Sequence, residues 1–157
     1  MSIACSIQRR YPDAFRYLRI MARFIAFDYG TQRIGIALTD SGAMIASPEC
    51  TCSPAELPEI LNRLVEAEAC AGFVVGQPGL ISGEQADSSA AIEAFAKTLQ
   101  KRHPEVPVFF VDEDYSSREA SAAMVMGGMR KSKRREKGNL DRIAAAIILQ
   151  RFLDSRP

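Results

Sequence analysis

One aspartate near the start of the chain ends an apolar run and is the residue whose position most strongly suggests chemistry. Asp28 follows the apolar stretch 24–27, and the turn 30–33, Gly-Thr-Gln-Arg, separates it from a second apolar stretch. Two strands joined by a tight connection typically show this pattern. A carboxylate at the end of a buried strand is costly unless it binds a metal ion or helps to hold a phosphate beside the glycine turn. Both functions indicate phosphate chemistry.

Two further acidic sites lie where apolar sequence ends or begins. The acidic stretch 112–114, Asp-Glu-Asp, follows the apolar run 106–111, and Asp141 lies in the first turn of a predicted apolar helix over 139–153. If this helix packs across the sheet, carboxylates from two strand ends and one helix start converge. Such like charges stay ionised together only with a cation, and oxygen ligands without His or Cys favour Mg²⁺ or Mn²⁺. Two such ions about 4 Å apart would serve in-line attack of water on a phosphodiester.

Simpler explanations exist for each acid. Asp141, with Asn139 as a cap, could be a favourable charge at a helix N-terminus, and the acidic stretch could be a solvated turn. Along strand 107–113, alternation sends Asp112 and Glu113 to opposite faces, so only one of them enters a shared site fully. The alternation does not decide which, and Asp112 stays a possible substitute for Glu113.

Basic charge is concentrated near the third acidic site. Residues 21–129 carry 7 basic and 15 acidic side chains, whereas residues 130–137 carry 6 basic and 1 acidic, within a net charge of +1 for the chain. A solvated loop would explain this segment, but its place beside a phosphodiester site predicts a clamp for a nucleic-acid backbone. The predicted contacts to nucleic acid are Arg33, Arg130, Lys131, Lys133, Arg134, Arg135 and Lys137.

Size and composition indicate an ordinary globular protein. The chain has 157 residues, 47% of them hydrophobic and 25% charged, and no apolar run approaches the length of a membrane span. We expect a single domain over 21–157, preceded by an arginine-rich extension, 1–20, that is flexible, precedes the natural start at Met21, or forms a short amphipathic helix over 12–20. The four cysteines, without zinc-site spacing, favour free thiols and a cytoplasmic location.

The periodicity of the apolar residues predicts an α/β domain with a mixed sheet. Three early strands should form an antiparallel meander, and later strands should add in parallel through helical crossovers. The expected elements are strands 23–28, 33–39 and 43–46, a loop 47–54, helix 55–69, strand 72–76, helix 85–101, strand 107–112, and helices 116–127 and 139–153.

Four motifs in order resemble the YqgF/RuvX family of RNase H-like nucleases, over residues 22–153. The motifs lie at 27–37, at 75–78 with Gly83, at 111–113 with 116–120, and at 137–141 with 144–149. The resemblance implies an RNase H-like fold and a divalent metal, most simply two Mg²⁺ or Mn²⁺ ions. It further implies either maturation of the 16S ribosomal RNA precursor or resolution of Holliday junctions.

The same resemblance assigns particular residues. Asp28, Glu113 and Asp141 match the family's acidic triad, which favours Glu113 over Asp112. The stretch 114–117 reads Asp-Tyr-Ser-Ser where the family usually has Arg-Leu-Thr-Thr, and the loop 79–82 lacks the usual asparagine. These departures concern substrate preference more than the triad.

Two other classes of function fit parts of the pattern. Sugar kinases and actin also place Asp-x-Gly-Thr after a strand, but this chain has no second copy of that loop. A non-catalytic nucleic-acid adaptor could retain binding without cleavage. The substrate, structured RNA or branched DNA, and the choice between monomer and homodimer stay open. A junction resolvase would need two sites related by two-fold symmetry, and Met124, Met126 and Met129 are either a dimer face or core filler.

Overall fold

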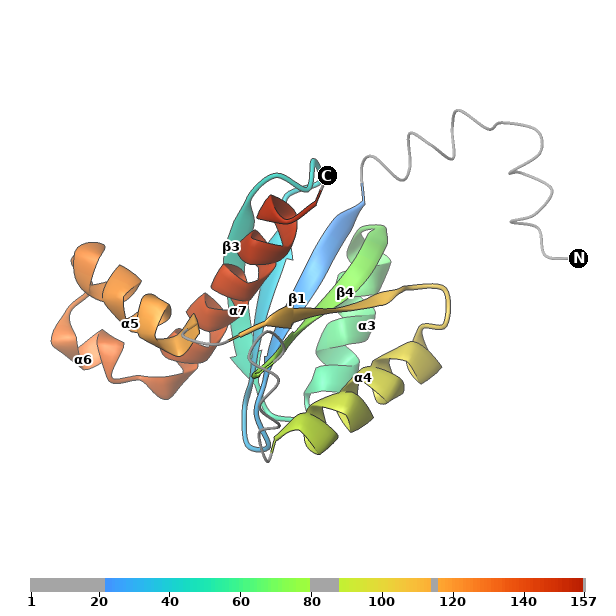
Figure 1. Ribbon diagram of the computed structural model, residues 1–157, viewed down its shortest axis with the longest axis horizontal. Coiled ribbons are helices and arrows are strands. Elements are labelled where there is room, and N and C mark those ends of the chain that lie inside the picture. Colours follow the sequence, from blue (N-terminus) through green and yellow to red (C-terminus); the bar gives the residue numbers. More distant parts are fainter. Residues whose placement is uncertain (1–21, 80–87, 114–115, 157) are drawn as a thin grey trace, which may run out of the picture.

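The apolar runs of the sequence form a five-stranded mixed sheet in the computed structural model, which describes residues 22–79, 88–113 and 116–156 (Figure 1). The sheet has the order β3-β2-β1-β4-β5, in which β1, β2 and β3 are antiparallel neighbours while β4 and β5 add in parallel. This confirms the predicted meander followed by parallel strands, the arrangement of an RNase H-like fold. The strands are β1 Arg23–Tyr29, β2 Ile34–Thr39, β3 Ala46–Cys52, β4 Cys70–Gln77 and β5 Val108–Asp112.

Helices cover both faces of this sheet. In Figure 1, α3 and α4 lie on one face and α7 lies across the other, with α5 and α6 packed beyond α7. The helices are α3 Leu57–Ala67, α4 Ser89–Arg102, α5 Ser116–Met126, α6 Lys131–Arg134 and α7 Lys137–Asp154. Among the described residues no helix combines the length and the apolar character that crossing a membrane requires.

Two hydrophobic clusters lie on opposite faces of the central strand, β1. Ile25 and Phe27 pack with α3 and α4, whereas Phe24 and Ala26 pack with α7. Because β1 is buried on both faces, its residues 24–27, between Arg23 and Asp28, are all apolar. The sheet presents the small residues Gly35 and Ala37 to α7, and α7 contributes the buried pair Ala144 and Ala145. Helix and sheet therefore approach closely.

The third strand was wrongly placed by the sequence pattern. Residues 47–54, predicted as a loop, instead supply most of β3, and residues 43–45 precede it. Pro48 lies in an edge strand, opposite Ala37, where the register with β2 shifts between Ile36 and Ala37. An edge strand with such an irregularity tolerates a proline that a central strand would not.

Other expectations differ less or cannot be compared. The basic segment contains the short helix α6, and the last helix begins at Lys137 rather than at 139. Met124 is buried whereas Met126 is 88% exposed, so these two methionines do not share one role. The extension 1–20, the loop residues 80–83 and Asp114 lie outside the described residues.

Candidate active site

Strand alternation places Asp28 on the face of the sheet that α7 covers. Side chains two positions apart along a strand share a face, so Asp28 continues the row of Phe24 and Ala26, which pack against α7. Asp28 is half-buried at the end of β1, where the apolar row stops. Its neighbour Tyr29 points to the other face and stacks on Phe95 of α4. Asp28 therefore lies near the end of the central strand, on the face that α7 covers.

The same alternation places Glu113 on this face. Val111 packs in the cluster around α7, and Glu113 lies two residues further along. A Cβ atom built on Gly76 of β4 would come 2.6 Å from Glu113 Oε2, which is itself buried from solvent. Glu113 also forms a side-chain hydrogen bond with Asp28. Of the two candidates that the strand pattern left open, Glu113 is the one beside Asp28, since alternation directs Asp112 to the opposite face.

Asp141 reaches the site because α7 packs directly against β2. Gly35 is paired with Asp28 across the β1–β2 ladder, and a Cβ built on Gly35 would overlap the backbone carbonyl of Asp141 and come 2.8 Å from Arg142 N. The absence of a side chain at Gly35 thus lets the N-terminal part of α7, at Asp141, lie over the end of β1. The Asp141 side chain is 19% exposed. Asp28, Glu113 and Asp141 are therefore brought together from three separate elements.

The electrostatics of the cluster follow from this crowding. Burial first, and the negative charge of Asp141 second, raise the pKa of Asp28 from 3.8 to about 6, although the hydrogen bond with Glu113 acts in the opposite direction. Two carboxyl groups can share a hydrogen bond only if a proton lies between them. A cation could replace that proton, so the pair Asp28–Glu113 has the chemistry of a site that accepts positive charge.

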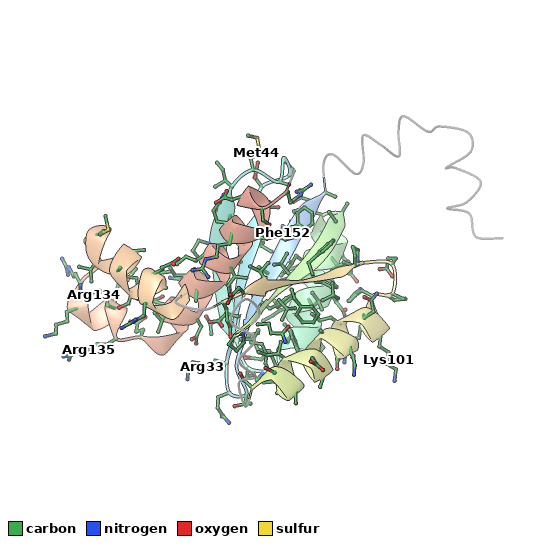
Figure 2. The ribbon with its side chains drawn as sticks, viewed as in Figure 1. Arg33, Met44, Lys101, Arg134, Arg135 and Phe152 are labelled. Atoms are coloured by element: carbon green, nitrogen blue, oxygen red, sulfur yellow. The ribbon has the colours of Figure 1, made fainter. Side chains whose placement is uncertain are left out.

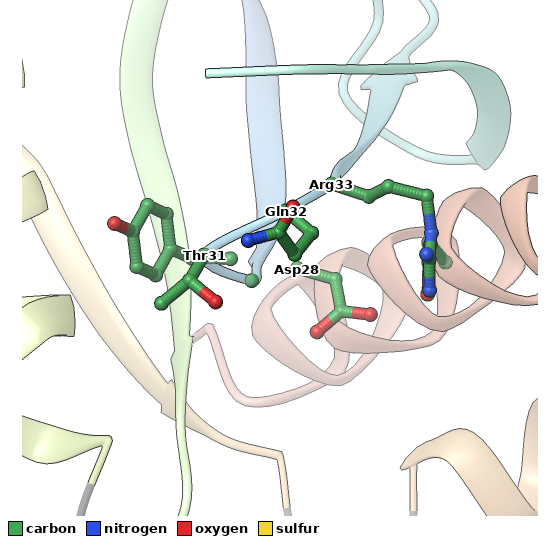
Figure 3. A pocket seen from close by; sticks show the side chains of 7 residues that line it. Asp28, Thr31, Gln32 and Arg33 are labelled. Atoms are coloured by element: carbon green, nitrogen blue, oxygen red, sulfur yellow. The ribbon is translucent and has the colours of Figure 1, made fainter.

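An open hollow of about 370 Å³ lies over Asp28 and Asp141 (Figure 3). Its remaining walls are Tyr29 and the turn 30–33, and Figure 3 shows the Asp28 carboxylate directed into the space between this turn and α7. Arg33 Nε donates a hydrogen bond to Asp141 Oδ2 over 2.8 Å. Arg33, predicted as a contact to nucleic acid, thus lies on the rim of the hollow and is paired with one of the three acids.

The donor set fits a hard divalent cation. All three side chains offer carboxylate oxygens, which Mg²⁺ and Mn²⁺ prefer, and the hollow gives room for water and a phosphate. Within the described ranges, no group of three or more His, Cys, Asp or Glu side chains, as they stand, is placed where it could hold a metal ion. One oxygen of Asp141 is engaged by Arg33 instead.

The basic residues gather at the α7 N-terminus, next to Asp141. Arg130, Lys131, Lys133 and Arg135 are exposed on and around α6, and Arg134 is half-buried. The Asn139 side chain donates hydrogen bonds to the Lys133 carbonyl over 2.9 Å and to Glu136 Oε2 over 3.0 Å, which ties α6 to α7. Figure 2 shows Arg134 and Arg135 projecting from α6, on the side of α7 away from α4. Lys137 begins α7.

Sequence reasoning missed residues that position the acids. Gly35 and Gly76 lie under α7 and Glu113, and glycines inside apolar strands are the signal that could have identified a close approach. Arg151 of α7 donates to the Asp112 carbonyl over 3.0 Å and forms an ion pair with Glu119 of α5. Arg151 thereby ties α7 to the end of β5 that carries Glu113, a contact between distant positions that no local pattern predicts.

Comparison with known proteins identifies a matching family and similar bacterial proteins. Residues 22–155 match the sequence profile of the RuvX family, described as "Holliday junction resolvase". A protein of Amoebophilus asiaticus named "Putative pre-16S rRNA nuclease" is 41% identical over 135 residues, which cover 86% of this chain and 96% of that protein. A protein of Christiangramia forsetii with the same name is 41% identical over 133 residues, covering 85% and 98%.

Among solved structures, Thermus thermophilus RuvC, in complex with a Holliday junction substrate, covers 85% of this chain and 97% of its own with a TM-score of 0.48 and 13% identity. The family profile spans nearly all of the described residues, and the two bacterial relatives are covered almost end to end. The chain therefore belongs to the RuvX family of nucleases.

Proposed function

We propose that this protein is a divalent-metal-dependent nuclease that hydrolyses phosphodiester bonds in the precursor of 16S ribosomal RNA. Asp28, Glu113 and Asp141 are its catalytic residues and hold the metal. The observation that carries the proposal is the convergence of these three carboxylates, from the end of β1, the end of β5 and the N-terminal part of α7, beside a hollow open to solvent.

The bound cations, two Mg²⁺ or Mn²⁺ ions, would supply polarisation of the scissile phosphate and activation of the attacking water. The chain's own residues supply the placement. Asp28 with its pKa of about 6 is ionised above that pH, so it offers a full negative charge to a cation at neutral pH. The exposed cations of α6 would hold the nucleic-acid backbone near Asp141, and the turn 30–33 lines the hollow.

The substrate follows from the relatives. The two bacterial proteins above are named for pre-16S rRNA and share 41% identity with this chain, which favours ribosomal RNA processing in ribosome biogenesis. The description of the matching family supports a second candidate, resolution of Holliday junctions in DNA recombination. The latter activity requires two active sites related by a two-fold axis, because two strands are cut, whereas RNA processing requires one.

A cleavage assay tests the proposal. Wild type and Asp28→Asn would each be incubated with a pre-16S rRNA 5′ end, single-stranded RNA, single-stranded DNA and a four-way DNA junction, in Mg²⁺ and in Mn²⁺. We expect cleavage of the ribosomal RNA end by wild type alone. Cutting of the junction instead would favour the resolvase. Binding without cleavage by wild type in every reaction would contradict a catalytic role and favour a non-catalytic adaptor.

The basic segment makes a separate prediction. Replacing Lys131, Lys133 and Arg135 by glutamine should weaken RNA binding. The slope of log K against log[salt] should decrease in magnitude by about 2, because each lost phosphate contact removes roughly 0.7 from this slope for a single strand. The rate at saturating RNA should change little because these side chains do not touch the acids.

A matched control for this variant lies on the opposite face. Lys97, Lys101 and Arg102 of α4 are exposed, and their triple glutamine variant removes the same charge (Figure 2 labels Lys101). Filter binding across a salt series should leave this control close to wild type. Equal losses in both triple variants would mean that net charge alone, and not α6, binds the nucleic acid.

A further inference from the structure

Arg33 takes part in an ion pair with an acid of the proposed metal site. Its Nε lies 2.8 Å from Asp141 Oδ2, and both side chains line the hollow that also contains Asp28 (Figure 3). A guanidinium at this place supplies positive charge to a region where the three carboxylates crowd together. A carboxylate oxygen that accepts a hydrogen bond from arginine has less electron density to offer to a cation, so the pair and a metal compete for Asp141.

The backbone of Arg33 is held in a closed turn, whereas its side chain is partly exposed to solvent. The Gly30 N–H donates to the Arg33 carbonyl over 2.9 Å and closes the turn, and a Cβ at Gly30 would come 2.7 Å from the same oxygen. The Arg33 side chain is 43% exposed, against 19% for Asp141. Changing the rotamers of this long side chain therefore requires no movement of β1 or β2.

We propose that Arg33 is an internal counter-cation of Asp141 that is displaced when a divalent cation binds and then contacts the substrate phosphate. This rests on the proposed function. The guanidinium stays at the rim of the hollow after release, where its planar set of donors suits a phosphate better than a lysine would. Arg33 is thus a positioning residue: it keeps the acidic cluster neutralised without metal, and it binds the nucleic acid once metal is present.

Calorimetric titration of the nucleic-acid-free protein with Mn²⁺ tests the first part. We expect Arg33→Gln to lower the Mn²⁺ dissociation constant by about three- to tenfold, because the metal no longer competes with an ion pair. Arg33→Lys should stay within about twofold of wild type. Arg63→Gln, an exposed arginine on α3, removes equal charge elsewhere and should also leave Mn²⁺ affinity unchanged.

The second part is tested by the KM of cleavage in saturating Mn²⁺. Arg33→Gln should raise KM about tenfold with a much smaller change in kcat, since a charged hydrogen bond to substrate is lost. Mn²⁺ binding that is unchanged or weaker in Arg33→Gln would overturn the counter-cation, and an unchanged KM would overturn the contact to phosphate. If wild type and Arg33→Gln both fail to bind Mn²⁺, the proposed metal-dependent function fails, and this inference fails with it. If both proteins bind Mn²⁺ with equal affinity, only the inference about Arg33 fails.

Discussion

Asp28→Asn is expected to unfold at a higher temperature than the wild-type protein at pH 7.5 in EDTA, although it loses cleavage by about 10²- to 10³-fold or more. The activity is lost because Asp28 is a member of the acidic cluster proposed to hold metal. The stability is gained because the charged form of Asp28 is unfavourable in the folded protein: burial and the neighbouring charge of Asp141 raise its pKa from 3.8 to about 6. Asparagine is neutral, and its amide can donate to Glu113 in place of the shared proton.

The sign and the pH window follow from this pKa. Because the folded protein binds the Asp28 proton more tightly than the unfolded chain does, the free energy of unfolding falls as pH rises from about 4 to about 6. Below that window the aspartate is neutral in both states and the penalty vanishes. Above it the penalty is complete, on the order of 1–3 kcal/mol. Asp28→Asn should therefore exceed wild type by about 3–10 °C in Tm at pH 7.5 and match it near pH 4.

Asp40 offers a control with the opposite electrostatics. Its Oδ1 accepts hydrogen bonds from the backbone N–H groups of Met44 and Ile45, both over 2.8 Å, and these hold its pKa below the usual value. Asp40→Asn should therefore not raise Tm at pH 7.5. Thermal unfolding followed by circular dichroism at several pH values measures all three proteins. The quantity to compare is the Tm of Asp28→Asn minus the Tm of wild type. If this difference is smaller at pH 7.5 than at pH 4, the proposed penalty is contradicted.

Added metal should reverse the order of stability. A ligand that binds only the folded state raises stability with its concentration, so Mg²⁺ or Mn²⁺ should raise the Tm of wild type more than that of Asp28→Asn. Asp28 thus lowers the folding stability of the metal-free protein and raises that of the metal-bound protein. Equal metal-induced shifts in the two proteins would show that Asp28 is not a ligand.

Much of this architecture could be predicted because the informative patterns are local. The continuous apolar run that ends in Asp28 predicts a buried strand, and the helical spacing of apolar residues after Asp141 predicts most of α7. The edge strand β3 could not be predicted in this way: Pro48 and the exposed residues 47–49 resemble a loop, and only pairing with β2 makes them a strand. Backbone pairing of this kind leaves little trace in composition, even when the partner is the preceding strand.

The choice between Asp112 and Glu113 also depends on packing that local sequence patterns do not reveal. Alternation along β5 established that the two residues point to opposite faces, but not which face α7 would cover. That depends on helix–sheet packing, which is decided by the small residues Gly35, Gly76 and Ala145 far away in sequence. The family resemblance favoured Glu113, and the structure places Glu113 beside Asp28. Arg33 was predicted as a nucleic-acid contact, and its ion pair with Asp141 was not visible in the sequence.

Gly35→Ala is expected to reduce both stability and cleavage, because the added methyl group would occupy the space of the Asp141 backbone. A Cβ at this position would overlap the Asp141 carbonyl and lie 2.8 Å from Arg142 N, and backbone atoms of a helix cannot move aside as a side chain can. Overpacking of this kind costs about 1–3 kcal/mol or more. The backbone of α7 at Asp141 must shift away from β2, and a displacement of about 1 Å at a catalytic group can cost a hundredfold in rate.

Gly138→Ala is the matched control, because it adds the same methyl group within α7 itself, three residues before Asp141. There a Cβ would lie 3.5 Å from Thr51 Cβ, an ordinary contact, and alanine favours a helix over glycine by roughly 0.5–1 kcal/mol. This variant should be as stable as wild type or more so, with cleavage within about twofold. Both variants would be compared below their Tm, with Mn²⁺ affinity as a second measurement. A Gly35→Ala protein with wild-type cleavage would show that the close approach of α7 to β2 does not position Asp141, whereas folded protein with weakened Mn²⁺ binding would show that it does.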